Sequence, residues 1–316
     1  MNSKVLLTGG LGYVGGRLAL ALHEAGHVVL CGTRRSGLSA PAWIPDMQMA
    51  HLDWDSIESL SMVCQGVDSV VHLSAMNEIE SANDPIGALQ MNGLASLRLL
   101  EAAKMVGVRR FIYFSTAHVY GSPLQGNIDE TTLPRPIHPY AITHKVAEDF
   151  VLAAHDRKQI EGVVIRLSNG FGAPATAAVD RWTLLVNDLC RQAVTIGELR
   201  LNSSGAQLRD FITLGDVARA ANHVLQLEAN QLADGLFNLG GGKATSILDM
   251  TNRIAARWQV LTGREIAIVR PTGDAASPPV LNYRYDKLAA TGFKLTSQVD
   301  REIDDTLKLC QQAFGK

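Results

Sequence analysis

The sequence has little of what marks several specialised classes of protein. Its 316 residues include four cysteines, widely spaced and with no Cys-x-x-Cys pair: Cys31, Cys64, Cys190 and Cys310. A disulfide framework or a cysteine zinc site is therefore not expected. The nine histidines predict no metal-binding set either, so we expect no metal.

The sequence also lacks an excess of one charge and long apolar runs. Lysine and arginine number 29 against 31 acidic residues, a net charge of −2, so nothing points to a nucleic-acid partner. No run of about 18 apolar residues predicts a membrane span. The N-terminus lacks the basic and then apolar pattern of a signal peptide, and we therefore expect a cytoplasmic protein.

The most informative feature that is present is a glycine-rich turn. Residues 9–15 read Gly-Gly-Leu-Gly-Tyr-Val-Gly, between the apolar run Val5–Leu7 and a helical pattern over Tyr13–Ala25. Glycines let the backbone turn sharply and approach a pyrophosphate, and the free N–H groups at a helix N-terminus attract it. This context predicts a dinucleotide-binding site.

Short apolar runs alternate with helical patterns through the first half of the chain. The predicted strands are Val5–Leu7, Val28–Cys31, Ser69–Leu73, Phe111–Ser115 and Val163–Leu167, and the predicted helices are Tyr13–Ala25, Ser56–Cys64, Pro85–Val106 and His138–His155. Such alternation is typical of an α/β fold with a doubly wound parallel Rossmann sheet and right-handed crossovers.

After residue 168 the pattern loosens. We expect a dinucleotide-binding domain over 1–168, rejoined by about 211–242, and a smaller C-terminal substrate-binding cap over most of 169–316. Its predicted elements are helices at Arg181–Ala193, Asp216–Leu227 and Ser246–Gln259, strands at Arg209–Thr213, Leu236–Leu239 and Ile266–Arg270, and a loop at Gly273–Pro279.

The segment after the second strand bears on the choice of cofactor. NAD-binding proteins usually place an acidic residue here for the ribose 2′-hydroxyl, but this chain has Thr33, Arg34 and Arg35. An arginine suits a 2′-phosphate, which favours NADP(H) and leaves NAD(H) possible. The alternative is that both arginines are solvated loop charges. Asp53 is a candidate for the adenine amino group, or equally a turn aspartate.

Further motifs appear in a fixed order, and together they resemble the extended short-chain dehydrogenases/reductases of the nucleotide-sugar epimerase/dehydratase group. The matching segments are Thr8–Gly15, Val71–Ala75, Asn92, Leu99–Ala103, Ser115–Gly121, Pro139–Tyr140, Arg166–Gly172, Arg209–Ile212 and Phe237–Gly241. They run nearly from end to end of the chain.

The resemblance implies a reaction centre. It makes Tyr140 the acid/base at the substrate oxygen and Thr116 the hydroxyl that binds that oxygen. The family places a lysine four residues after the tyrosine, to hold the nicotinamide ribose and lower the tyrosine pKa, but here that residue is His144. Lys145 lies one position further on and points about 100° away on a helix.

Three interpretations of this departure stay open. His144 does the work of the lysine, the helix is wound locally so that Lys145 reaches the site, or the protein has little redox activity. A second departure is clearer. The acidic pair of family dehydratases is replaced by Ala117 and His118, so we do not expect sugar dehydration.

The residues themselves and the resemblance together assign positions to each ligand. The predicted catalytic residues are Tyr140, Thr116 and His144, and the predicted substrate-binding residues are Thr116, His118, Asn169 and Arg209. The predicted cofactor-binding residues are Gly9, Gly12, Tyr13, Val14, Gly15, Thr33, Arg34, Arg35, Asp53, Trp54, Leu73, Ser74, Ala75, Asn92, Ser115, Tyr140, His144 and Leu167. Arg209 matches the arginine that contacts the diphosphate, or else it pairs with Asp210 or Asp216.

The first functional hypothesis is an NADP(H)-dependent oxidoreductase that reduces a nucleotide-linked 4-keto sugar. The alternative is an NAD-dependent nucleotide-sugar epimerase, and a further one is a cofactor-binding regulator with weak or no catalysis. The resemblance also implies a homodimer through the helices Pro85–Val106 and His138–His155, whose apolar residues Leu94, Leu97, Val146 and Phe150 suit either an interface or the core.

Overall fold

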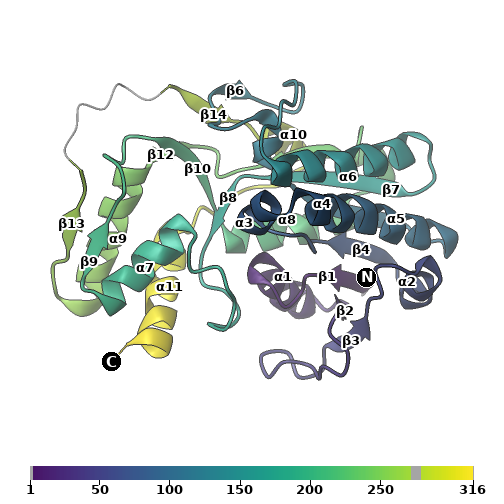
Figure 1. Cartoon of the computed structure of the whole chain (residues 1–316), viewed down its shortest axis with the longest axis horizontal. Coiled ribbons are helices and arrows are strands. Elements are labelled where there is room, and N and C mark those ends of the chain that lie inside the picture. The colour runs from purple at the N-terminus through teal and green to yellow at the C-terminus, as the bar shows by residue number, and fades with distance from the viewer. Residues whose placement is uncertain (1–2, 272–278, 316) are drawn as a thin grey trace.

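Seven parallel strands form the central sheet of the computed structural model, which describes residues 3–271 and 279–315 (Figure 1). The predicted loop at Gly273–Pro279 lies outside these residues except for Pro279. The strand order is β11 (Leu236–Leu239), β7 (Glu161–Leu167), β5 (Arg110–Thr116), β4 (Ser69–His72), β1 (Lys4–Thr8), β2 (Val28–Thr33) and β3 (Gln48–His51). The predicted doubly wound parallel sheet is confirmed.

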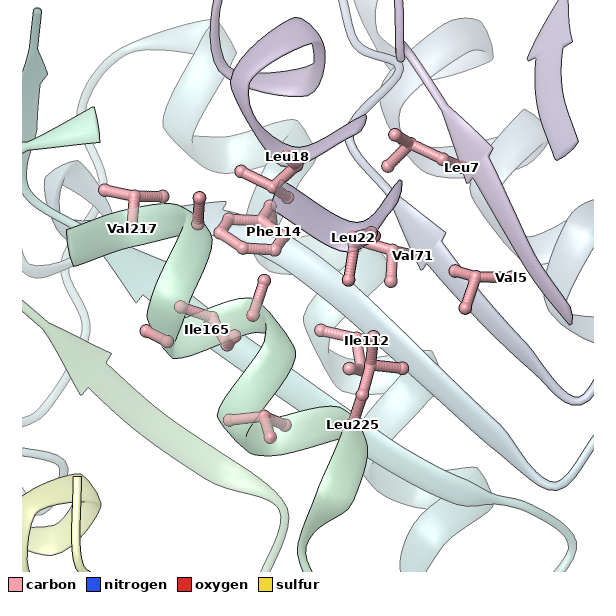
Figure 2. Packing of buried hydrophobic residues seen from close by; sticks show 14 of the residues in the cluster. Val5, Leu7, Leu18, Leu22, Val71, Ile112, Phe114, Ile165, Val217 and Leu225 are labelled. Carbon is pink, nitrogen blue, oxygen red and sulfur yellow. The ribbon is translucent and has the colours of Figure 1, made fainter. Parts of the chain in front are cut away.

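Helices cover both faces of this sheet (Figure 1). One face is covered by α1 (Tyr13–Glu24) and α8 (Leu214–Gln226), and the other by α2 (Ile57–Cys64), α5 (Ala95–Met105) and α6 (Pro139–Asp156). Side chains alternate along each strand because successive Cβ atoms point to opposite faces. In β5, Ile112 and Phe114 therefore pack with α1 and α8 (Figure 2), whereas Tyr113 packs in the opposite layer.

A smaller C-terminal lobe packs three helices against two short sheets. The helices are α7 (Leu185–Thr195), α9 (Ile247–Thr262) and α11 (Val299–Phe314), and the sheets are β12 (Ala244–Ser246)–β10 (Leu208–Thr213)–β8 (Asn169–Phe171) and β13 (Ala267–Val269)–β9 (Glu198–Arg200). A further pair joins β14 (Leu281–Tyr283) to β6 (Gly126–Ile128).

Several predicted elements differ from the structure. Both Arg209–Thr213 and Leu236–Leu239 are strands, but only the second joins the main sheet, since β10 pairs with β8 and β12 instead. Pro85–Val106 is not one regular helix: α4 (Pro85–Ala88) leads into a π-helical turn, η1 (Leu89–Leu94), and then into α5. The division of the chain at residue 168 stays a prediction.

Three helices were missed in the sequence, one of them the short α10 (Asp286–Ala290). The short helix α3 (Glu78–Asn83) begins with a capping box formed by Asn77 and Glu80, a signal that was present but not used. Helix α11 buries Ile303, Leu307 and Cys310 on one face, at helical spacing.

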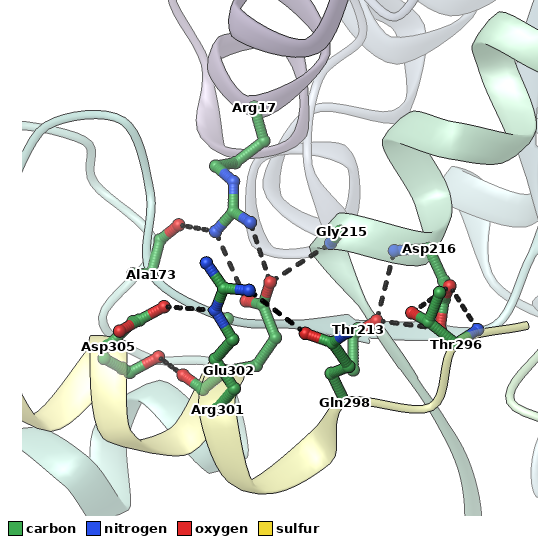
Figure 3. Close-up of polar contacts among 12 residues, drawn as sticks. Arg17, Ala173, Thr213, Gly215, Asp216, Thr296, Gln298, Arg301, Glu302 and Asp305 are labelled. Carbon is green, nitrogen blue, oxygen red and sulfur yellow. Dashed lines mark hydrogen bonds and ion pairs between the residues drawn. The ribbon is translucent and has the colours of Figure 1, made fainter.

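An ion pair joins the two lobes near the glycine turn (Figure 3). The Arg17 guanidinium on α1 lies 2.7 Å from Glu302 Oε1 on α11, and it also donates to the Ala173 carbonyl at 2.7 Å. Glu302 accepts a further hydrogen bond from the Gly215 N–H at 3.2 Å. The C-terminal lobe is therefore anchored to the first helix of the sheet domain.

Candidate active site

A cleft of about 920 Å³ lies over the carboxyl ends of strands β1, β2, β4, β5 and β7 and is closed on one side by the C-terminal lobe. Ligands of open α/β sheets bind at this edge. The cleft is lined by most of the predicted site residues, and they come from segments far apart in the sequence.

The glycine turn forms a cradle with no room for side chains. A Cβ atom on Gly15 would lie 2.0 Å from the Gly9 carbonyl oxygen, and Gly9 itself has φ +72°, in the left-handed region that favours glycine. Gly12 is the N-cap residue of helix α1 and supplies no side-chain cap, which leaves the first N–H groups of the helix available. A cradle of backbone donors at a helix N-terminus fits a pyrophosphate.

The loop after β2 carries two cations toward the cleft. Arg34 and Arg35 line it and are exposed, and within residues 3–271 and 279–315 neither forms an ion pair. The Thr33 hydroxyl accepts a hydrogen bond from the Arg35 N–H at 3.2 Å. Asp53 does not line the cleft: its Oδ1 accepts from the Asp55 N–H at 3.0 Å, so it behaves as a turn aspartate, whereas the neighbouring Trp54 does line the cleft.

Thr116, His118, Tyr140 and His144 all line the cleft. Thr116 ends β5, and its hydroxyl accepts from the His118 N–H at 3.2 Å. Tyr140 lies in the first turn of α6. Burial raises the pKa of Tyr140 above its ordinary value, and Glu78 adds to this, while Arg181 and the Thr116 hydroxyl oppose it. At neutral pH the Tyr140 side chain is consequently a proton donor.

His144 lies one turn after Tyr140, with the two rings 4.4 Å apart and edge to face. Its Nδ1 is 2.7 Å from the Tyr113 hydroxyl, while its buried Nε2 has no hydrogen-bond partner among the described residues. Burial lowers the pKa of His144 to about 3, so the ring is neutral and supplies no positive charge. An unpartnered buried ring nitrogen in the cleft wall fits a ligand hydroxyl.

Lys145 does not reach the cleft. Its ammonium group forms an ion pair with Asp149 on the outer side of α6, as the helix-face argument predicts. The geometry therefore disagrees with the interpretation in which a locally wound helix brings Lys145 into the site in place of the family lysine. His144 is the residue that occupies the position four after Tyr140.

Two residues predicted to bind the cofactor, Asn92 and Ser115, use their side chains for hydrogen bonds within the protein. Asn92 is fully buried and does not line the cleft: its Oδ1 accepts from the Met76 N–H at 2.7 Å, and its Nδ2 donates to the Thr143 hydroxyl at 3.0 Å. Asn92 thus ties a cleft-lining loop to the helix that carries Tyr140. Ser115 lines the cleft, but its hydroxyl donates to Glu148 at 2.5 Å.

On the lobe side, Arg209 faces the cleft without a carboxylate partner. No hydrogen bond or ion pair engages its guanidinium within the described ranges, and burial lowers its pKa. Neither carboxylate that the sequence offered pairs with it: Asp216 pairs with Arg219 at 2.8 Å, and Asp210 Oδ1 accepts from Ser168 at 2.6 Å. An arginine at the cleft wall with free donors suits a diphosphate. Asn169 also lines the cleft and donates to the Asp210 carbonyl at 2.9 Å.

Sequence reasoning missed a pair of charges beside Tyr140. Arg181, in the lobe segment before α7, lies 3.6 Å from Glu78 at the start of α3, and both line the cleft. No motif indicated this contact. Tyr113 was missed as well, although its spacing of two from Ser115 on a predicted strand places both side chains on one face.

Residues 23–27 read His-Glu-Ala-Gly-His, the spacing of a zinc-binding helix. The helix ends at Glu24, however, and the His27 ring contacts the Ser3 hydroxyl at 2.7 Å and Asn222 at 3.0 Å. Among the described residues no cluster of three or more His, Cys, Asp or Glu side chains has the arrangement of a metal site. No helix in those ranges is long and apolar enough to cross a bilayer.

Comparison with known proteins agrees with this geometry. A model of the NAD dependent epimerase/dehydratase family matches residues 5–240. The chain belongs to this family. The resemblance seen in the motifs is thereby confirmed, as is the expectation of a nicotinamide-dependent enzyme of the sugar-nucleotide oxidoreductase or epimerase class.

Several relatives match over most of their length. A UDP-glucose 4-epimerase from Corynebacterium glutamicum is 30% identical, over 87% of this chain and 86% of its own. A second, from Azospirillum brasilense, is 27% identical over 91% of this chain and 85% of its own. Among solved structures, MoeE5 in complex with UDP-glucose and NAD is 26% identical, covers 99% of this chain and 100% of its own, and has a TM-score of 0.78. These similarities favour the epimerase alternative over the reductase that we expected first.

Proposed function

We propose that this protein interconverts the C4 epimers of a UDP-linked hexose, using NAD(H). The observation that carries the proposal is the meeting of Tyr140, Thr116 and His144 with the glycine cradle in one cleft. The choice of UDP and of C4 epimerisation is supported by the relatives, several of which are UDP-glucose 4-epimerases.

Each group in the cleft has a role in this chemistry. The nicotinamide, when bound, supplies a carbon that takes up a hydride and returns it. Tyr140 moves the proton of the sugar 4-hydroxyl, and the Thr116 hydroxyl holds that oxygen. The glycine cradle binds the pyrophosphate of the dinucleotide, and the free guanidinium of Arg209 binds the diphosphate of the sugar nucleotide.

The test is a direct assay of epimerisation. The purified protein is incubated with NAD and UDP-glucose, UDP-N-acetylglucosamine or UDP-glucuronic acid in turn, and the C4 epimer is followed by proton NMR. We expect interconversion with no net change in NADH. Tyr140→Phe should lose turnover and keep cofactor binding, because the hydroxyl acts in the transition state.

A second candidate, reduction of a 4-keto sugar by NADPH, is favoured by Arg34 and Arg35, which line the cleft without acidic partners. The protonated state of Tyr140 also suits a proton donor. If this candidate holds, NADPH is consumed in proportion to product. Replacing both arginines by alanine should then weaken NADPH far more than NADH, whereas equal losses argue for NAD(H). Tight cofactor binding without turnover on any substrate would favour a regulator.

We also propose a homodimer through α6 and the α4–η1 segment, which pack side by side. Apolar side chains exposed on these elements are Ile86, Leu89, Leu94, Ile142 and Phe150, whereas Leu97 and Val146 are partly buried. Exposed apolar groups gathered on one surface are typical of an interface. Light scattering at micromolar concentration should give twice the chain mass of 34.1 kDa, and a monomer would refute the proposal.

A further inference from the structure

Tyr113 lies directly behind the candidate active site and contacts it through one atom. It is on β5, 1% exposed, and its hydroxyl is 2.7 Å from Nδ1 of His144. Among residues 3–271 and 279–315 this is the only hydrogen bond within 3.5 Å that either side chain makes, and the Ser96 hydroxyl is the other polar group that acts on the Tyr113 hydroxyl. The nearby Ser96 hydroxyl is already held by the His72 ring at 2.8 Å and by the Asn92 carbonyl at 2.7 Å.

The positions of the protons follow from these contacts. Burial and the nearby Glu148 raise the pKa of Tyr113, so its hydroxyl keeps its proton, and the His144 ring is neutral. A neutral imidazole carries one N–H, on either nitrogen. If that hydrogen were on Nδ1, it would face the phenol oxygen, and the phenol hydrogen would be left with the Ser96 oxygen, which already has two partners and lies beyond 3.5 Å or at a poor angle. With the phenol donating to Nδ1, the phenol hydrogen has its acceptor at 2.7 Å, and the imidazole hydrogen lies on Nε2, where it is left for a ligand.

We propose that Tyr113 is a positioning residue that holds His144 as the Nε2–H tautomer, which directs one neutral N–H donor at a ribose hydroxyl of the cofactor. The assignment of the tautomer stands on the contact alone, whereas its use toward the ribose rests on the proposed function. The donor takes over the binding role of an ammonium group but brings no charge.

A second contact of the same kind keeps His144 in place. Along β5, Tyr113 and Ser115 face α6, and along α6, His144 and Glu148 face β5, one turn apart. Glu148 accepts from Ser115 at 2.5 Å and forms a buried ion pair with Arg166 on β7, with N–O distances down to 2.6 Å. The two contacts fix the rotation of α6 about its axis, which places Tyr140 and His144 toward the cleft.

The tautomer is measurable without activity, by nitrogen NMR of the free protein labelled with ¹⁵N-histidine. The signal of His144 is identified by its loss in His144→Gln. We expect an unprotonated Nδ1 and a protonated Nε2 in the wild type. Finding the hydrogen on Nδ1 would overturn the proposal, whatever any variant does.

The variant Tyr113→Phe removes only the donor to Nδ1. We expect the share of the Nδ1–H tautomer to rise and NADH affinity, measured by fluorescence titration, to fall about threefold to tenfold, as for loss of one hydrogen bond. Tyr120→Phe is the matched control, because it removes another tyrosine hydroxyl, partly buried and bonded to Asn238 at 2.8 Å, and should change neither quantity. An unchanged tautomer in Tyr113→Phe contradicts the inference. Absence of epimerisation with the expected tautomer contradicts only the proposed function.

Discussion

Two fully buried histidines should make this protein unusually sensitive to mild acid. Burial lowers the pKa of His72 and of His144 to about 3, from about 6.5 in an exposed histidine. In the folded protein both rings stay neutral, whereas in the unfolded chain both take up a proton as the pH falls below 6.5. Folding lowers the pKa of each ring, so the folded protein has its full stability above the unfolded pKa of about 6.5. As the pH falls from there toward 3, the unfolded chain takes up protons that the folded protein does not, and the free energy of unfolding decreases.

The magnitude follows from proton binding to the unfolded state. Between pH 7.5 and pH 5.0, each of these histidines should lower the free energy of unfolding by about 2 kcal/mol, and the pair by about 4 kcal/mol. The calculated loss depends almost wholly on the pKa of the unfolded chain, because the folded pKa of about 3 lies far below pH 5.

The assay is urea unfolding at both pH values for the wild type, His72→Gln, His144→Gln and the double variant. Each substitution has its own packing cost, so the quantity to compare is the loss in unfolding free energy between pH 7.5 and pH 5.0. That loss should shrink by about 2 kcal/mol for each histidine removed. His51→Gln, at an exposed histidine, controls for the loss of a histidine as such. An equal loss in the wild type and the double variant would refute the reasoning.

Three other substitutions test the site and its support. Arg166→Met should destabilise the protein by about 3–5 kcal/mol, because it leaves the Glu148 carboxylate buried without its partner. Adding Glu148→Leu should recover most of this loss in urea unfolding, and simple additivity of the two substitutions would contradict the prediction. Gly15→Ala should abolish NADH binding in a fluorescence titration, since its Cβ meets the Gly9 carbonyl oxygen at 2.0 Å. In Gly16→Ala the nearest atom to the new Cβ is the Ala175 methyl at 3.0 Å, so this variant should bind NADH far better. Arg209→Ala should weaken UDP-glucose but not NADH in calorimetry, with Arg219→Ala, paired to Asp216, as the control; equal effects of the two variants would remove Arg209 from the substrate site.

Much of the fold could be predicted because backbone geometry sets local periods. Strand alternation, helical spacing and glycine turns are properties of short segments, so the parallel sheet and the turn before α1 were visible in the sequence. The same local geometry separated His144 from Lys145, which lie about 100° apart on any helix. The departure from the family pattern was therefore readable, and so was the side of α6 on which it matters.

Only the tertiary structure decided which buried groups become partners. Tyr113 and His144 are 31 residues apart, and their contact exists because β5 and α6 are packed together. The same holds for Asn92, which bonds to a loop and to α6 rather than lining the cleft. It also holds for Arg209, which lines the cleft while Asp210 bonds to Ser168 and Asp216 pairs with Arg219. A polar side chain has many possible partners in a sequence, and the fold selects among them by distance, burial and the need to satisfy every buried donor and acceptor.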